Sequence, residues 1–274
     1  MAQTTPNSSS PKWALITGAS AGIGAGFARQ LAAQGWSLVL VARRADKLQQ
    51  VQAAVNDINP VVTCHLVSLD LAEPSATEQL VAFCQTQGVS VDYLVNNAGY
   101  GVPGDFEHVD WTTHQAMLQV MLTSVVELCR AFYPSMKTAG YGRIINVSSL
   151  AGLTPPTAGH TLYGAVKSFL IKFSHSLHLE AKEHGVHVTA LCPGFTYTEF
   201  HDVNGTRGMV SQLSKKLWMT ADDVVAQGLD AVAHNRPVYV NGWRNKAIAS
   251  LSKYLPDAVI RFLMRGSIKK FRKR

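Results

Sequence analysis

Residues 13–24 read WALITGASAGIG, and this stretch predicts the fold of the chain. Trp13–Thr17 is typical of a buried strand, and a glycine-rich turn then leads into a helical pattern that ends near Gly35. Glycines at a helix N-terminus let the backbone approach a pyrophosphate, although any tight strand-to-helix turn also needs small residues. The candidate dinucleotide contacts in this turn are Gly18, Ser20, Ala21, Gly22, Ile23 and Gly24.

Short apolar runs and amphipathic stretches alternate along the rest of the chain. Strands are predicted at 13–17, 37–42, 61–67, 92–96, 143–147, 187–192 and 237–240, and helices at 22–34, 45–57, 75–87, 109–138, 161–184 and 221–234. This βαβ rhythm predicts an α/β fold with a doubly wound, Rossmann-type, mostly parallel sheet and helices on both faces. We expect a disordered leader at 1–11, a single domain at 12–245 and a helical basic extension at 246–274.

The positive charge of the chain lies at its end. The formal net charge is +7, but seven of the 25 Lys and Arg residues lie within 261–274, which leaves 18 basic against 18 acidic residues elsewhere. A balanced body argues against nucleic-acid binding. Apolar residues in the tail follow helical spacing between the cations, so the tail either contacts an anionic membrane surface or packs against the fold.

Cysteine usage predicts a reducing compartment and no metal site. Cys64, Cys84, Cys129 and Cys192 lie far apart in apolar runs without CxxC spacing. We therefore expect buried thiols, a cytoplasmic location and a soluble chain, since no window has the roughly 18 uninterrupted apolar residues of a membrane span. The histidines at 175, 178, 184 and 187 match no known metal-ligand spacing.

The residues that follow the second, third and fourth strands favour NADP(H) as the cofactor. Arg43 and Arg44 end the second strand, where a cation suits a 2′-phosphate, although they could also be the solvated start of a helix. Asp70 and Leu71 follow the third strand, in a position that fits an adenine contact. The NNAG sequence at 96–99 follows the fourth strand and adds Asn97, Ala98 and Gly99 as candidate contacts and a structural turn.

Tyr163 and Lys167 are the candidate reactive pair. Four residues apart on a helix, their side chains share one face, and a nearby ammonium group lowers the pKa of a phenol from about 10. The spacing also arises by chance, so its place among the other motifs carries the inference. Ser149, at a strand end, could donate a hydrogen bond to a substrate carbonyl, and Ser148 is the weaker candidate.

Taken in chain order, these motifs resemble the short-chain dehydrogenase/reductase family over roughly residues 12–245. The resemblance implies that Ser149 polarises a carbonyl, Tyr163 transfers the proton, and Lys167 binds the nicotinamide ribose and lowers the pKa of Tyr163. After the sixth strand, Pro193, Gly194, Thr196 and Thr198 could hold the nicotinamide carboxamide. A homodimer or homotetramer built on the helices at 109–138 and 161–184 is the corresponding expectation.

Two positions depart from the family pattern. Met121 stands where the family usually has a catalytic asparagine, and the usual Gly-rich ending is replaced by the sequence from Val240 to Trp243 and about 30 further residues. A methionine could still serve the proton relay through its backbone carbonyl. The first departure also leaves open a cofactor-binding regulator or scaffold with little catalysis.

The segment at about 199–220, where the family places its substrate cover, predicts an apolar substrate. It carries Phe200, Met209, Val210, Leu213, Leu217, Trp218 and Met219, which could contact a ketone, acyl chain or ring system or could simply pack the cover. The sequence thus predicts an NADP-dependent oxidoreductase acting on an apolar ketone or aldehyde, or on the corresponding alcohol. A 3-oxoacyl-thioester reductase is the alternative within the same class.

Overall fold

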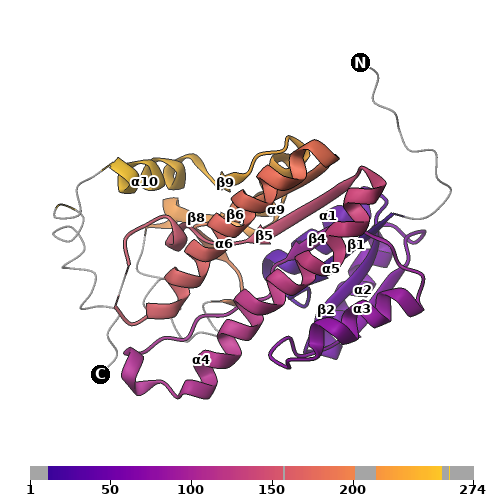
Figure 1. The fold of residues 1–274 in the computed structure, drawn as a ribbon, viewed down its shortest axis with the longest axis horizontal. Coiled ribbons are helices and arrows are strands. Elements are labelled where there is room, and N and C mark those ends of the chain that lie inside the picture. Colours follow the sequence, from indigo (N-terminus) through magenta and orange to yellow (C-terminus); the bar gives the residue numbers. More distant parts are fainter. Residues whose placement is uncertain (1–11, 157, 201–213, 255–258, 260–274) are drawn as a thin grey trace.

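The central sheet has seven parallel strands in the order β3-β2-β1-β4-β5-β6-β9 (Figure 1). The computed structural model describes residues 12–156, 158–200, 214–254 and 259. The strands are β1 (Trp13–Thr17), β2 (Ser37–Ala42), β3 (Cys64–Ser68), β4 (Val91–Asn96), β5 (Gly142–Val147), β6 (Val186–Cys192) and β9 (Val238–Val240). The strand order reverses between β1 and β4, so a ligand crevice is expected at the carboxyl ends of these two strands.

Helices cover both faces of the sheet, which explains why the strands lack polar alternation. One layer consists of α1 (Gly22–Ala33), α2 (Ala45–Ile58) and α9 (Ala221–Ala233), and the other of α3 (Ala76–Thr86), α5 (Ser124–Ala139) and α6 (Thr161–Ala181). Within β1, Ala14 and Ile16 pack against the first layer, whereas Trp13 and Leu15 pack against the second. The predicted doubly wound fold in a single domain is confirmed.

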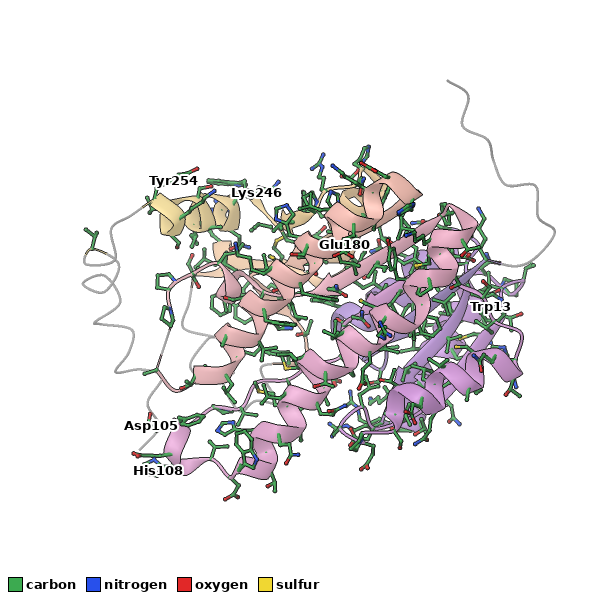
Figure 2. The ribbon with its side chains drawn as sticks, viewed as in Figure 1. Trp13, Asp105, His108, Glu180, Lys246 and Tyr254 are labelled. Atoms are coloured by element: carbon green, nitrogen blue, oxygen red, sulfur yellow. The ribbon has the colours of Figure 1, made fainter. Side chains whose placement is uncertain are left out.

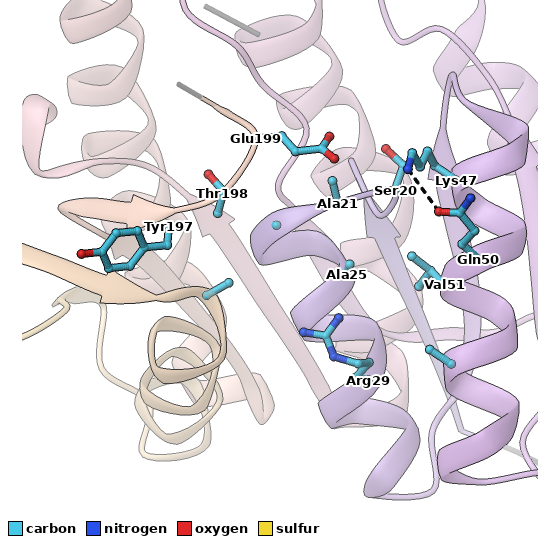
Figure 3. Close-up of a pocket in the computed structure, with 13 residues that line it drawn as sticks. Ser20, Ala21, Ala25, Arg29, Lys47, Gln50, Val51, Tyr197, Thr198 and Glu199 are labelled. Carbon is cyan, nitrogen blue, oxygen red and sulfur yellow. Dashed lines mark hydrogen bonds between the residues drawn. The ribbon is translucent and has the colours of Figure 1, made fainter. Parts of the chain in front are cut away.

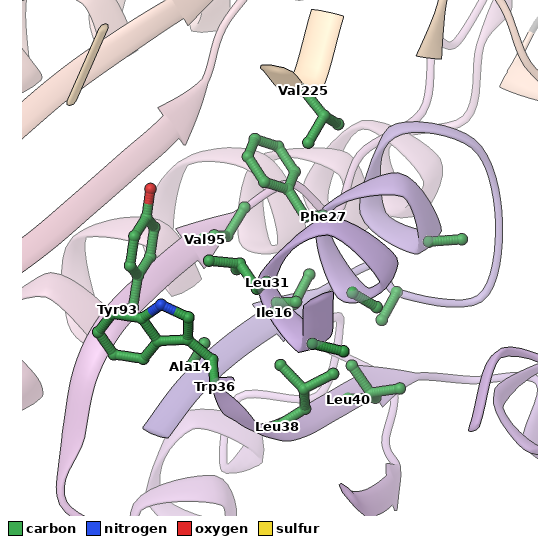
Figure 4. Packing of buried hydrophobic residues seen from close by; sticks show 14 of the residues in the cluster. Ala14, Ile16, Phe27, Leu31, Trp36, Leu38, Leu40, Tyr93, Val95 and Val225 are labelled. Atoms are coloured by element: carbon green, nitrogen blue, oxygen red, sulfur yellow. The ribbon is translucent and has the colours of Figure 1, made fainter. Parts of the chain in front are cut away.

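The first layer holds α1 tightly above β1 (Figure 4). Phe27 of α1 is fully buried, and Trp36 meets the ring of Tyr93 edge-on at 5.4 Å. A Cβ on Gly228 of α9 would lie 2.8 Å from Leu191 Cδ2, so the absence of a side chain there lets α9 approach the sheet. This close packing fixes the N-terminus of α1 at the crevice.

Several boundaries differ from the sequence prediction. The third strand begins at Cys64 rather than at 61, because Asn59 and Pro60 form a turn in which the N–H groups of Val61 and Val62 bond back to Asn59. The prediction missed the two-stranded sheet of β7 (Phe195–Tyr197) and β8 (Trp218–Thr220), whose strands are too short to show a pattern. The predicted leader, most of the cover and the basic tail lie outside the described residues.

The helix predicted at 109–138 is a composite. It consists of α4 (Trp111–Leu118), a π-helical turn η2 (Gln119–Thr123) and α5, and in η2 the N–H of Ser124 bonds to the Gln119 carbonyl. By length and composition alone, Trp111–Ala139 could cross a membrane. Its α5 part instead packs against the sheet through Leu128 and Phe132, as the core helix of a globular domain does.

The ends of two further predictions need correction. The helix predicted at 161–184 ends at Ala181 and continues as a 3₁₀ turn over Lys182–His184. The C-terminal helix α10 (Trp243–Tyr254) begins before residue 246 and packs against the domain. All four thiols are free; Cys84, Cys129 and Cys192 are buried as expected, whereas Cys64 is only partly buried.

Candidate active site

The glycine-rich loop is held against the end of β4 by Thr17. Its Oγ1 accepts hydrogen bonds from the N–H groups of Asn97 (3.0 Å) and Ala98 (3.1 Å), and Asn97 Nδ2 donates to the Gly18 carbonyl (3.2 Å). Gly18 has a φ of +64°, and a Cβ on Gly24 would collide with the Gly18 carbonyl. This cradle, which a side chain would fill, fits the close approach of a pyrophosphate.

The two arginines after β2 point to different partners. Arg44 Nη2 donates to Ser20 Oγ in the loop (3.2 Å), whereas Arg43 Nη1 lies 3.7 Å from Asp70 Oδ2. Arg44 also forms an ion pair with Glu199 (3.0 Å), which the sequence did not indicate. Arg44 is therefore the arginine that stands beside the loop, where a 2′-phosphate is expected.

The remaining predicted cofactor residues lie around this crevice. Asp70 Oδ1 accepts a hydrogen bond from the N–H of Ala72 (3.0 Å), which closes the turn after β3. Leu71, which lies in that turn, is buried in an apolar cluster. Ile23, in the first turn of α1, is partly buried against the first helix layer. A side chain at Gly99 would meet the side chain of Met121.

A groove of about 420 Å³ opens beside the loop (Figure 3). Ser20, Ala21 and Gly22 line one part of it, and Thr198 and Glu199, directly after β7, line another. A Cβ on Gly22 would lie 2.9 Å from Thr198 Cγ2, so this segment lies directly against the loop. Among the described residues the groove does not extend to Tyr163, so it belongs to the phosphate side of the crevice.

Ser149, Tyr163 and Lys167 come together at the carboxyl end of β5. The Ser149 side chain hydrogen-bonds to the Tyr163 hydroxyl, and Lys167 Nζ lies 5.7 Å from the centre of the Tyr163 ring. Lys167 is buried and donates to the Val147 carbonyl (2.8 Å). Ser148 points elsewhere: its hydroxyl donates to the Lys167 carbonyl (2.7 Å), which favours a structural part for it.

Burial dominates the ionisation of this cluster. It raises the pKa of Tyr163 to about 12, against which the hydrogen bond from Ser149 acts in the lowering direction. It also lowers the pKa of Lys167 to about 8. The net rise comes from withdrawal of the phenol from water, which outweighs the hydrogen bond from Ser149, and the expectation that Lys167 lowers the pKa of Tyr163 stays a prediction.

Met121 is part of the core. Its side chain is buried in a cluster with Met117, Val120 and Val166, and a Cβ on Gly99 would lie 3.4 Å from Met121 Cγ. The helix is wound as a π turn at this position, and Ser124 Oγ donates to the Val120 carbonyl (2.8 Å). The irregular winding thus occurs with a methionine at the position usually held by asparagine.

The segment after β6 connects the two halves of the site. The Pro193 carbonyl accepts a hydrogen bond from the N–H of Leu150 (2.9 Å), beside Ser149. Thr196 is buried and donates to the Gly194 carbonyl (3.1 Å), while a Cβ on Gly194 would lie 2.5 Å from Asn245 Nδ2 of α10. This segment therefore runs from the Ser149 loop, past α10, to the glycine-rich loop at Thr198.

A buried chain of polar side chains behind the site escaped the sequence analysis. Asn96 Nδ2 donates to Asn146 Oδ1 (2.8 Å), Asn146 Nδ2 donates to Ser174 Oγ (2.9 Å), and Ser174 donates to the Leu170 carbonyl (2.6 Å). The chain links β4 and β5 to α6, which carries Tyr163 and Lys167. Asn146, a polar residue inside the apolar run at 143–147, was the one available signal.

Within the described part of the chain, no group of three or more His, Cys, Asp or Glu side chains is arranged to hold a metal ion. The rings of His175 and His178 on α6 meet edge-on, with their centres 6.4 Å apart. His187 Nδ1 lies 2.8 Å from the Val232 carbonyl, a contact with α9 that gives this residue a structural part.

Comparison with known proteins places the chain in a family. Residues 12–207 match the family of short chain dehydrogenases. The chain belongs to the short-chain dehydrogenase family. It is 36% identical over 188 residues to sulfoacetaldehyde reductase of Chromohalobacter salexigens, covering 68% of this chain and 73% of that protein. It is 33% identical over 194 residues to the NADP-dependent 3-hydroxy acid dehydrogenase YdfG of Escherichia coli K12, covering 69% and 75%.

Solved structures agree with this assignment. A 7beta-hydroxysteroid dehydrogenase superposes with a TM-score of 0.81 at 26% identity, covering 92% of this chain and 96% of that one. A short-chain dehydrogenase from Sphingobium yanoikuyae in complex with NADPH superposes with a TM-score of 0.77 at 27% identity, covering 90% and 97%. The protein is an NADP(H)-dependent oxidoreductase, as the sequence predicted.

The burial of Lys167 generates a pH-dependent stability. Because its pKa is lowered from 10.5 to about 8 on folding, a charged Lys167 opposes folding below pH 8, and this penalty disappears as the pH rises to 10.5. We expect Lys167→Met to stabilise the cofactor-free protein by roughly 2 kcal/mol at pH 7, and the gain to shrink towards pH 10. Urea unfolding of both proteins at several pH values measures this, with exposed Lys172→Met as the control. A gain independent of pH would contradict it.

Proposed function

We propose that the protein is a carbonyl reductase that transfers hydride from NADPH to an apolar ketone or aldehyde, or back from the corresponding alcohol, with Tyr163 as the proton-transfer residue. The observation that carries the proposal is the hydrogen bond between Ser149 and Tyr163 beside the buried Lys167. Bound NADPH supplies the hydride. The glycine-rich loop, Arg44 and the segment at Pro193–Thr198 are the residues that would hold it.

The catalytic steps follow from the chemistry of the three side chains. The Ser149 hydroxyl donates a hydrogen bond to the carbonyl oxygen and so polarises the carbon. Tyr163, kept protonated by its raised pKa, gives its proton to the same oxygen as negative charge develops there. Lys167, fixed by its bond to Val147, places a positive charge beside the phenolate that results.

Two features support a neutral, apolar substrate. The rings of Phe200 and His160 lie 5.9 and 6.5 Å from the ring of Tyr163 and give the reacting group aromatic neighbours. Asp105 and Glu107 line a hollow of about 290 Å³ together with Thr161, two residues before Tyr163, and carboxylates there would disfavour an anionic substrate. Figure 2 shows Asp105 at the outer end of the molecule, beside α4.

The relatives support different substrates. Sulfoacetaldehyde and 3-hydroxy acids are small anions, whereas the structural neighbour takes its name from a hydroxysteroid. We favour the apolar class because of the two carboxylates at the hollow.

Of the predicted cover residues that are described, Trp218 stacks on Tyr197 at 4.8 Å, so its ring packs β8 onto β7. Met209, Val210 and Leu213 lie outside the described residues.

Two alternatives remain from the sequence. A 3-oxoacyl-thioester reductase would use the same three side chains on a longer substrate. A regulator or scaffold that binds NADP(H) with little catalysis is motivated by Met121, but the contact between Ser149 and Tyr163 beside Lys167 argues against it.

Contact with a membrane surface is a further part of the proposal. The predicted tail lies outside the described residues, but α10 precedes it and exposes Trp243 (70%), Leu251 (58%) and Tyr254 (77%). The guanidinium of Arg244 and the ammonium of Lys253 lie 4.4 and 5.5 Å from the rings of Trp243 and Tyr254, and α10 has no acidic residue. Figure 2 shows Tyr254 and Lys246 at the outer edge. An apolar face bordered by cations suits anionic lipids.

A homodimer or homotetramer and a cytoplasmic location also remain proposals. Phe169 and Leu179 of α6 are exposed, and Phe169 stacks on Phe173 at 6.0 Å. An apolar, exposed helix of this kind supports burial against a second copy of the chain. The free thiols suit a reducing compartment.

Replacing Tyr163 with Phe removes only the hydroxyl that passes the proton. We expect Tyr163→Phe to lower turnover at least 100-fold while leaving the Kd for NADPH nearly unchanged, because general acid catalysis contributes about 10²–10⁴-fold. Steady-state kinetics and fluorescence titration of NADPH measure the two effects, with Tyr254→Phe on α10 as the matched control. A fully active Tyr163→Phe variant would exclude the proposed role.

A substrate panel separates the candidate reactions. We expect NADPH oxidation with bulky apolar ketones, and kcat/KM values lower by at least about tenfold for sulfoacetaldehyde and 3-oxo acids because of repulsion at Asp105 and Glu107. Asp105→Asn and Glu107→Gln should raise activity on the anions alone. Preference for 3-oxoacyl thioesters would favour the alternative reductase, and tight NADPH binding without any turnover would favour the regulator.

The α10 face predicts binding to anionic vesicles. We expect cosedimentation with vesicles that contain phosphatidylserine, weakened about fivefold by Lys253→Gln, since each cation near such a surface contributes about 1 kcal/mol. Leu251→Asn should also weaken it, whereas Lys172→Gln on α6 should not. Equal binding to pure phosphatidylcholine vesicles, or none to either, would count against this contact.

A further inference from the structure

Arg44 has an anionic partner within the chain. Its Nη2 lies 3.0 Å from Glu199 Oε2 and 3.2 Å from Ser20 Oγ, so one nitrogen serves both a carboxylate and the loop hydroxyl. The two charged side chains are 45% and 47% exposed, which leaves the pair accessible to an incoming ligand. The pair joins residues 155 positions apart.

The position of Glu199 follows from its neighbours. Thr198 packs against Gly22 of the loop, and Glu199 is the next residue along the chain. Glu199 and Ser20 both line the groove beside the loop, and Figure 3 shows both close to Ala21. Arg43 is directed to Asp70 instead, so it does not compete for Glu199.

A carboxylate and a phosphate bind a guanidinium group in the same way. Both accept hydrogen bonds from its N–H groups, so a 2′-phosphate beside Ser20 needs the Nη2 that Glu199 holds. The phosphate would also meet the negative charge of Glu199. NADH has a neutral hydroxyl at this position and therefore neither competes with Glu199 nor is repelled by it.

We propose that Glu199 is an internal counter-ion of Arg44 that the 2′-phosphate of NADP(H) displaces, and that it thereby limits the preference for NADP(H) over NAD(H). The inference rests on the assigned use of NADP(H) and adds a specificity-determining residue to it. Arg44 attracts the phosphate, and Glu199 reduces the net gain.

Direct titration of the full chain with NADPH and with NADH tests the proposal. Glu199→Gln keeps the shape of the side chain and removes its charge, so we expect the Kd for NADPH to fall roughly threefold to tenfold and the Kd for NADH to change less than about twofold. Glu199→Asp, charged but shorter, should fall between the two. Glu183→Gln, in the exposed 3₁₀ turn after α6, removes the same charge elsewhere and should change neither value.

Two further comparisons make the test specific. In an Arg44→Gln background the tightening caused by Glu199→Gln should shrink, because only the direct repulsion between Glu199 and the phosphate remains; an undiminished effect would show that Glu199 acts without Arg44 and would overturn the proposal. An unchanged or weaker affinity of Glu199→Gln for NADPH, or equal tightening of NADH, would overturn it as well, while leaving the reductase intact. A wild-type chain that bound NADH as tightly as NADPH would instead overturn the cofactor assignment and this inference together.

Discussion

The hydroxyl group of Thr17 is the contact on which the carboxyl edge of the sheet depends. It joins the ends of β1 and β4, the two strands between which the sheet order reverses, by accepting from two consecutive N–H groups. Without that oxygen, two partly buried donors would lose their partner, at a cost of at most about 1–3 kcal/mol each. The glycine-rich loop and the NNAG turn therefore keep their shapes jointly, and the segment at Thr198 packs against the surface they form.

The sequence predicted the structure correctly where the pattern of apolar residues in a segment reflects how that segment is buried in the fold. The runs at 13–17 and 37–42 have no polar face, and both are strands buried under two layers of helices. The order of the motifs led to Ser149, Tyr163 and Lys167, which the fold brings together. The pairing of Glu199 with Arg44 could not be predicted, because it depends on how two loops far apart in the chain meet. The π turn over Gln119–Thr123 was likewise not predicted, because five residues are too few for spacing to distinguish a π turn from an α turn.

Burial away from water shifts the pKa values of Tyr163 and Lys167 more than neighbouring charges do. Withdrawal from water holds Tyr163 in its protonated form and weakens the hold of Lys167 on its proton. A protonated phenol is the form that the proposed reduction consumes. A ligand that brought negative charge close to Lys167 would strengthen its ammonium form and make the phenolate less costly.

The polar chain from Asn96 through Asn146 to Ser174 has a mechanical consequence. The amide and hydroxyl groups in it reach their partners only when β4, β5 and α6 have one relative alignment. A shift of α6 by one residue would displace Ser174 by about 1.5 Å along the helix axis and break its hydrogen bond with Asn146. These hydrogen bonds thus fix the position of α6 along the sheet. The position of Tyr163 on α6 therefore depends on hydrogen bonds in the middle of the molecule, behind the site.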